Sequence, residues 1–135
     1  MKLLLDTHIV LWAALEPERI SQTARDMLVD PANTRLVSAA SAWEIATKVA
    51  LGKLPLPEPP QTFLDRAMAD LCCGELPISM KHALAAATLV RHHNDPFDRL
   101  LVAQAITERA TLVTADGALP PYVVHGLLLL WAKPS

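Results

Sequence analysis

The sequence predicts an α/β fold, a three-layer α/β/α sandwich with a mainly parallel sheet of roughly five strands. Short apolar runs of strand length alternate with longer segments that carry helix start and stop signals, which is typical of parallel sheets covered by helices. The chain has 135 residues, the size of one common domain. We therefore expect residues 1–135 to form a single domain.

The first half of the chain opens with the apolar run Leu3–Leu5, which fits a strand buried on both faces. Ser21 is a favourable N-cap residue, and Gly52 is a common signal at a helix C-terminus. The predicted elements are, in order, a strand over Leu3–Leu5, helices over Ile9–Leu15 and Ser21–Val29, a strand over Thr34–Val37, and a helix from Ser41 to about Leu51.

The second half begins with a proline-rich segment, residues 55–60, which favours an extended connector within the domain. Further on, Asp95 followed by Pro96 is a typical helix start with Asp95 as the N-cap. The predicted elements are a helix over Thr62–Leu71, a weak strand over Leu76–Ile78, helices over Met80–Val90 and from Asp95 to about Arg109, and strands over Thr111–Thr114 and Val123–Trp131.

Composition limits the classes of partner and location. The formal charge is −2, so a nucleic-acid partner would be held by local cations and metal ions, because no global basic field exists. Adjacent Cys72 and Cys73 do not form a disulfide framework, which fits a reducing, cytoplasmic setting. Hydrophobic residues make up 52% of the chain, so we expect another chain to cover part of the surface.

Membrane insertion is not expected. No apolar run approaches the roughly 20 residues that a spanning helix needs. Asp6 and His8 interrupt the apolar N-terminal segment, which makes a signal peptide a poor interpretation.

Four acids, Asp6, Glu44, Asp98 and Asp116, stand where an apolar segment gives way to a turn or to the first turn of a helix. In an open α/β sheet, ligands bind outside the carboxyl ends of the strands, so acids at successive junctions can converge on one crevice. Crowded carboxylates repel and raise the pKa of at least one of them. Ligation by oxygen alone favours Mg²⁺ or Mn²⁺, and a metal-activated water could hydrolyse a phosphodiester bond.

Each acid also has an ordinary structural explanation, which stays open at this point. A buried acid such as Asp98, which lies on an apolar stripe with no evident basic partner, is nevertheless costly without a cation. The structural explanations are a helix cap for Asp6, a capping box with Ser41 and a pair with Lys48 for Glu44, a helix-dipole position for Asp98, and an Asp-Gly turn for Asp116.

Several longer motifs resemble those of PIN-domain ribonucleases, specifically the VapC-type toxins of toxin–antitoxin pairs. The resemblance extends over nearly the whole chain, and its Trp-Glu-Ile and Asp-Pro-Phe-Asp-Arg segments are far more specific than any isolated acid. The matching segments are residues 3–8, Leu11-Trp12, residues 38–46, residues 51–54, residues 92–101 and residues 112–116. One departure is the loop after Asp116, which has Leu119 where an aromatic residue is expected.

The resemblance implies an endoribonuclease that depends on Mg²⁺, with Mn²⁺ able to replace it. It implies a homodimer that cleaves RNA and is inhibited by a cognate antitoxin whose tail covers the acidic groove. The residues implied are Asp6, Glu44, Asp98 and Asp116 as the catalytic metal site, with Thr7 and Thr114 as supports. The cations that could hold the RNA backbone are Arg99, Lys48, Lys53 and Arg91. Arg99 and Lys48 could equally neutralise the neighbouring acids, and Lys53 and Arg91 could be ordinary solvated charges.

Three alternatives remain from the residues themselves. A catalytically inactive interaction module of the same fold would use its apolar surface to bind another chain. A phosphohydrolase with Asp6 as nucleophile is disfavoured because His8 occupies the place of the second acid. A zinc site made from His92, His93 and Asp95 is weaker still, because a polar loop and a helix cap explain those residues.

Overall fold

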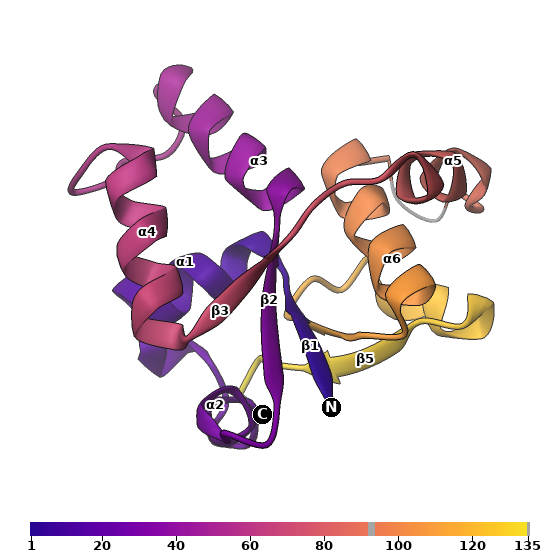
Figure 1. Ribbon diagram of the computed structural model, residues 1–135, viewed down its shortest axis with the longest axis horizontal. Coiled ribbons are helices and arrows are strands. Elements are labelled where there is room, and N and C mark those ends of the chain that lie inside the picture. The colour runs from indigo at the N-terminus through magenta and orange to yellow at the C-terminus, as the bar shows by residue number, and fades with distance from the viewer. Residues whose placement is uncertain (92–93, 135) are drawn as a thin grey trace.

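The computed structural model, which describes residues 1–91 and 94–134, contains a five-stranded sheet in the order β3-β2-β1-β4-β5. Every neighbouring pair of strands is parallel, and β1 lies at the centre (Figure 1). The strands are β1 (Lys2–Leu5), β2 (Thr34–Ser38), β3 (Cys73–Leu76), β4 (Thr111–Thr114) and β5 (Leu128–Trp131).

Helices cover both faces of this sheet. In Figure 1, α1, α2 and α4 lie on one side, α6 lies on the other with α5 outside it, and α3 extends beyond the carboxyl ends of the strands. The helices are α1 (Thr7–Leu15), α2 (Gln22–Val29), α3 (Ala39–Ala50), α4 (Pro60–Leu71), α5 (Met80–Thr88) and α6 (Pro96–Glu108), with short 3₁₀ helices η1 (Pro17–Arg19) and η2 (Pro120–His125).

The central strand explains the three layers, because successive side chains of a strand point to opposite faces. Leu3 and Leu5 pack in a cluster with Ile9 of α1 and Leu28 of α2. Leu4 packs on the other face in a cluster with residues of α6 and η2. All three leucines of β1 are fully buried. The predicted three-layer α/β/α sandwich with a parallel sheet is therefore confirmed.

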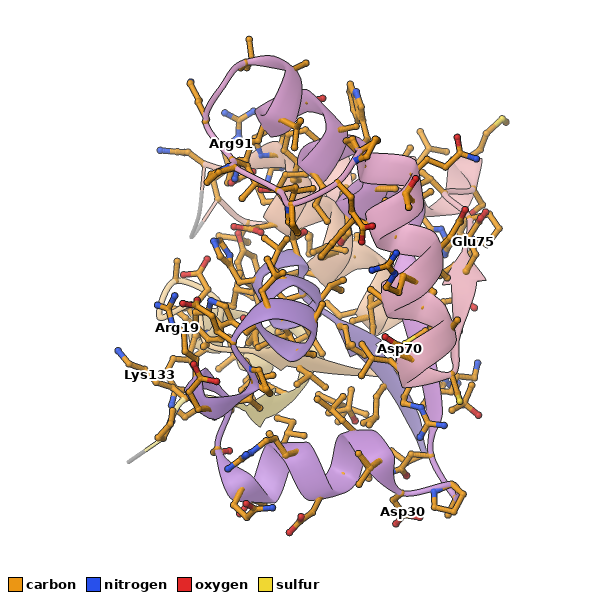
Figure 2. All side chains as sticks on the ribbon, turned by 90° about the vertical axis from the view of Figure 1, so that its left-hand side faces the viewer. Arg19, Asp30, Asp70, Glu75, Arg91 and Lys133 are labelled. Carbon is orange, nitrogen blue, oxygen red and sulfur yellow. The ribbon has the colours of Figure 1, made fainter. Side chains whose placement is uncertain are left out.

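A third apolar cluster fixes α3 above the end of the sheet. Leu11 of α1, Ile45 of α3 and Phe63 of α4 form its buried part. This cluster joins α1, which follows β1, to α3, which follows β2, and to α4, so it sets where the first turns of α3 lie relative to the end of β1. Charged side chains such as Asp30 and Glu75 are exposed and project away from the apolar layers (Figure 2).

Two strand predictions were wrong in position. The third strand is Cys73–Leu76, not Leu76–Ile78, because α4 ends in a left-handed cap at Cys72 (φ 52°) and the chain enters the sheet at once. The last strand begins at Leu128, because residues 120–125 form η2, which ends at Gly126 with φ 101°. A positive φ of this kind is readily adopted by glycine.

The predicted capping box of Ser41 and Glu44 was also wrong. The helix begins earlier, at Ala39, and the side chain of Ser38 accepts the capping hydrogen bond from the Ala40 N–H.

Among the helices of residues 1–91 and 94–134, none combines the length and the apolar character that a membrane span requires.

Candidate functional site

Asp6 and Thr114 meet where the neighbouring strands β1 and β4 end. The Asp6 N–H donates to the carbonyl of Val113 at 3.0 Å, which continues the pairing of β1 with β4. The Thr114 hydroxyl donates to Asp6 Oδ2 at 2.7 Å, and both residues are buried. The same hydroxyl accepts from the Asp116 N–H at 3.0 Å. Thr114 therefore positions both acids at the carboxyl edge of the sheet.

The side chain of Asp6 is not a helix cap. Asp6 occupies the N-cap position of α1 but makes no capping hydrogen bond with its side chain. Its Oδ1 atom is buried and has no hydrogen-bond partner within the described part of the chain. Burial raises the pKa of Asp6, and the negative charge of nearby Asp116 raises it further. Hydrogen bonds from the Thr114 hydroxyl and the Thr7 backbone, together with the charge of His8, act in the opposite direction and lower the pKa. A buried carboxylate with one oxygen left over favours a proton or another cation.

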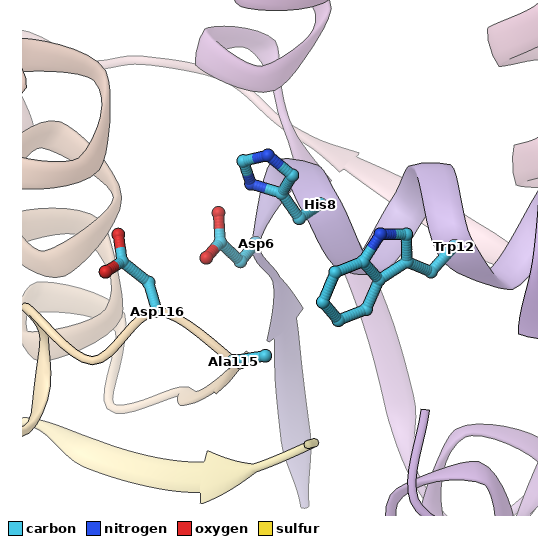
Figure 3. A pocket seen from close by; sticks show the side chains of 5 residues that line it. All are labelled: Asp6, His8, Trp12, Ala115 and Asp116. Carbon is cyan, nitrogen blue, oxygen red and sulfur yellow. The ribbon is translucent and has the colours of Figure 1, made fainter. Parts of the chain in front are cut away.

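The Asp116 side chain stabilises a turn and also lines a cavity. Its Oδ1 accepts from the Ala118 N–H at 2.9 Å, as the Asp-Gly turn predicts. Asp116 also lines a cavity of about 340 Å³ together with Asp6, His8 and Trp12. Figure 3 shows the carboxyl groups of Asp116 and Asp6 next to each other, with the His8 ring on the other side of Asp6.

A second acidic group lies between α3 and α6. Glu44 is 2% exposed, and its Oε2 pairs with Lys48 Nζ at 2.7 Å. Its Oε1 is buried without a hydrogen-bond partner among residues 1–91 and 94–134. The hydrogen bond to Glu44 is the largest cause that raises the pKa of Lys48, and the negative charges of Asp95 and Asp98 add to it against the effect of burial. Lys48 thus pairs with one acid and lies near enough to two others for their charges to raise its pKa.

The contacts between the helices bring these two groups to the same end of the molecule. The Thr7 hydroxyl donates to the Ser41 hydroxyl at 2.9 Å, which joins the start of α1 to α3 one turn before Glu44. The rings of Trp43 and Phe97 lie edge to face with centroids 5.2 Å apart, which joins α3 to α6 beside Asp98.

The acids nevertheless do not form one compact cluster. In the described part of the chain, no three His, Cys, Asp or Glu side chains are close enough to hold a metal ion together. The structure instead shows Asp6 with Asp116, and Glu44 with Lys48 near Asp98. The expectation that Asp98 has no basic neighbour was wrong, since Lys48 lies near enough to feel its charge. Lys48 already offsets part of the negative charge that we expected a divalent ion to neutralise.

The remaining candidates have varied surroundings. Arg99 donates from Nη2 to the Ala86 carbonyl at 2.9 Å and so ties α6 to α5. Lys53 and Arg91 are exposed. Asp95 caps α6 by accepting from the Phe97 N–H at 2.9 Å, as predicted. The proposed zinc ligands His92 and His93 lie outside the described residues.

The loop after Asp116 is well packed despite its departure from the expected motif. Leu119 is fully buried in the same cluster as Tyr122, and its N–H donates to the Asp116 carbonyl at 3.2 Å. An aliphatic side chain therefore fills the position at which we expected an aromatic one.

His8 and Trp12 were not selected from the sequence as site residues, although both line the acidic cavity. They lie four residues apart at the start of the helix that follows Asp6. Side chains with this spacing share one helix face, so their position beside a site at Asp6 could have been found from the sequence.

Comparisons with known proteins agree with this arrangement. The family model of the PIN domain matches residues 3–121. Ribonuclease VapC22 of Mycobacterium tuberculosis is 31% identical over 113 residues, which covers 84% of this chain and 85% of that protein. Ribonuclease VapC16 of the same organism is 43% identical over 72 residues, 53% of this chain, and the match spans about half the length of that protein (49%).

Solved structures share the fold at lower sequence identity. VapBC2 from Rickettsia felis, bound to a DNA fragment from its promoter, gives a TM-score of 0.71 at 21% identity, covering 98% of this chain and 100% of that chain. FitAcB from Neisseria gonorrhoeae gives a TM-score of 0.65 at 20% identity, covering 95% of this chain and 96% of that chain.

Proposed function

The chain belongs to the PIN domain family, and we propose that it is a divalent-metal-dependent endoribonuclease that acts as the toxin of a toxin–antitoxin pair. Its similarity to ribonucleases VapC16 and VapC22 supports the reaction class. The observation that carries the proposal is structural. Asp6 Oδ1 and Glu44 Oε1 are buried carboxylate oxygens without a hydrogen-bond partner in the described chain, and both lie near the carboxyl edge of a parallel sheet.

These residues fit a hard cation. A buried polar atom that makes no hydrogen bond is destabilising, and a cation bound at Asp6 would remove that cost for Oδ1. The oxygen atoms available at the site belong to carboxylate and hydroxyl groups, which are ligands that suit Mg²⁺ or Mn²⁺. We assign Asp6 and Asp116 as direct ligands, with Glu44 and Asp98 completing the acidic site. When bound, a divalent ion would lower the pKa of a water molecule and offset the charge of the phosphate.

The chain's own residues would prepare the site for this chemistry. Thr114 holds Asp6 Oδ2, so Oδ1 is directed elsewhere in a fixed orientation. Lys48 holds Glu44 Oε2 and is 40% exposed, so its ammonium group can also reach a phosphate at the surface. Thr7 supports the site indirectly, by fixing Ser41 and the first turns of α3.

The proposal extends to partners and location. We propose that a cognate antitoxin inhibits the protein and that the protein forms a homodimer. We also propose that it acts in the cytoplasm and that residues 1–135 form one domain. Large exposed apolar side chains such as Trp43 (63% exposed) and Leu84 (69%) support burial against other chains. FitAcB and VapBC2 share only the fold with this chain, so they do not identify its partner.

The test is cleavage of RNA by the purified protein. Wild type with Mg²⁺ or Mn²⁺ should cut total RNA at defined positions, and excess EDTA should abolish the cuts. Asp6→Asn and Glu44→Gln should each reduce cleavage by at least about 100-fold, since each removes a charged oxygen from the site. Equal cleavage by wild type and Glu44→Gln would remove Glu44 from the mechanism or reveal a contaminating nuclease.

The alternative is an inactive PIN-like interaction module. The pairing of Glu44 with Lys48 favours it, since an internal cation reduces the need for a metal ion. Absence of cleavage together with no metal-induced change in melting temperature would support this alternative.

A further inference from the structure

A second cavity, of about 430 Å³, adjoins the acidic cavity along α1. His8 and Trp12 line both cavities, so the hollow continues from Asp6 and Asp116 toward η1. Its volume falls in the range of roughly 300–1,000 Å³ that is usual for sites binding small ligands. The other residues that line it are Leu11, Leu15, Glu16, Arg19, Leu54 and Pro55.

Trp12 forms a flat, supported surface in this hollow. The indole packs against the core cluster on the α1 side of the sheet and stays partly exposed. The Arg19 guanidinium lies over it, 4.4 Å from the ring centroid, and Glu16 holds that guanidinium at 3.1 Å. The His8 ring is 6.1 Å away and tilted by 54°. Aromatic rings and planar guanidinium groups are the surfaces on which unpaired bases of single-stranded RNA stack.

The charge of the lining changes along the hollow. Its first part contains two carboxylates, Asp6 and Asp116, and its second part contains one acid, Glu16, together with Arg19, which pairs with it. Lys133 is exposed on the same side of the molecule as Arg19 (Figure 2), and a 2.7 Å hydrogen bond from the Ser21 N–H to the Ala132 carbonyl joins their two segments. Cations at this end would attract the next phosphate of a nucleic-acid strand.

We propose that Trp12 and Arg19 form a subsite for one unpaired nucleobase next to the phosphodiester bond that is cut. The inference rests on the proposed nuclease function, because the acids mark where that phosphodiester lies. Figure 3 shows the Trp12 indole extending toward Asp6 and Ala115. The Arg19 guanidinium lies over this indole, so a base stacked on the outer face of the guanidinium would belong to a nucleotide close to the acids. Stacking on an aromatic face accepts every base, so this subsite would contribute affinity and position more than sequence choice.

The test compares two strands that differ only in their bases. One is a short 2′-O-methyl oligouridine, and the other is an abasic strand of the same length. All proteins carry Asp6→Asn, which prevents the proposed cleavage and removes one repulsive carboxylate, and binding is measured by fluorescence anisotropy at low salt. Trp12→Ala should weaken binding of oligouridine by about 5- to 100-fold and leave the abasic strand unaffected. Trp12→Phe, which keeps an aromatic face, should restore most of the lost affinity.

Two further variants separate stacking from general damage. Trp131 is 41% exposed and lies outside both cavities, so Trp131→Ala is the matched control and should bind both strands like the parent. Arg19 has a side chain that is 53% exposed, so Arg19→Gln should leave the fold intact and still weaken binding of oligouridine more than of the abasic strand. This second variant keeps the test valid if Trp12→Ala does not fold.

The proposal is overturned if the parent binds both strands equally, or if Trp12→Ala and Arg19→Gln keep the parent's preference for bases. It also fails if Trp12→Ala leaves RNA binding intact but releases a copurified protein partner, since the hollow would then be a protein-binding groove. If binding depends on the bases and on Trp12 but the protein cleaves no RNA, the proposed nuclease function is refuted and the proposed stacking subsite stands.

Discussion

Replacing Asp6 with Asn should change stability in opposite directions with and without a divalent ion. Burial raises the pKa of Asp6 above its ordinary value of 3.8, so the folded protein binds this proton more tightly than the unfolded chain does. The stabilising contribution of the group is therefore complete below pH 3.8 and is lost as pH rises through the folded-state pKa. In EDTA at pH 7, Asp6→Asn should melt above wild type, and the difference should shrink toward pH 4.

The expected effect of the metal ion follows from linkage. An ion that binds only the folded chain stabilises it by about 2.7 kcal/mol at a hundredfold excess over Kd. Unfolding entropy of about 2.1 cal/mol/K per residue gives about 0.28 kcal/mol/K for 135 residues, so wild type should melt about 10 °C higher. If loss of the Asp6 ligand weakens affinity about a hundredfold, the same ion concentration adds only about 0.4 kcal/mol, or 1–2 °C.

The assay is thermal unfolding followed by circular dichroism, in EDTA and then in MgCl₂ or MnCl₂. Asp95→Asn is the matched control, because Asn caps a helix as well as Asp does and Asp95 has no assigned metal role. It should show the same metal-induced shift as wild type. Equal shifts in wild type and Asp6→Asn, or a lower melting temperature for Asp6→Asn in EDTA at pH 7, would refute the assignment of Asp6.

Three further outcomes follow from the same structure. Thr114→Val removes a hydrogen bond that lowers the pKa of Asp6, so the acid limb of the pH profile for RNA cleavage should move to higher pH, and an unmoved limb would contradict this. Ser38→Ala removes a helix cap and a partner of buried Gln104, so urea denaturation should show a loss of about 2–3 kcal/mol, and a loss below about 1 kcal/mol would argue against both roles. Partial burial raises the pKa of the Cys73 thiol to about 11, so its alkylation by iodoacetamide, followed by mass spectrometry, should be slow at pH 8 and accelerate toward pH 11; rapid reaction at pH 8 would refute the raised pKa.

The sheet could be predicted because its central strand has a simple signal. Leu3–Leu5 is apolar at every position, and a strand covered on both faces buries such a run completely. The edge strand β3 gives no comparable signal, since Gly74 and Glu75 within it are exposed. Its position depends on the left-handed cap at Cys72, and a non-glycine residue at positive φ is rarely expected from sequence.

The four acids could be located from the sequence, and so could Lys48 as a partner of Glu44, but the burial of that pair could not. The spacing of Glu44 and Lys48 permits a pair on any exposed helix, where it would contribute little. Here the Glu44 side chain is buried where α3 packs against its neighbours. Lys48 therefore pairs with one carboxylate oxygen, and the other has no hydrogen-bond partner in the described chain. That difference arises from tertiary packing, which local spacing does not encode.

The asymmetry of the Glu44–Lys48 pair bears on how the site can respond to a cation. Lys48 is 40% exposed, so its ammonium group can reach water, whereas Glu44 stays in its buried place and needs another cation if Lys48 leaves. The negative charge is therefore fixed and its internal counter-ion is exchangeable. An acid held in this way can keep the fold stable without a metal ion and still offer a ligand when a metal ion competes with Lys48 for Glu44 or a phosphate competes with Glu44 for Lys48.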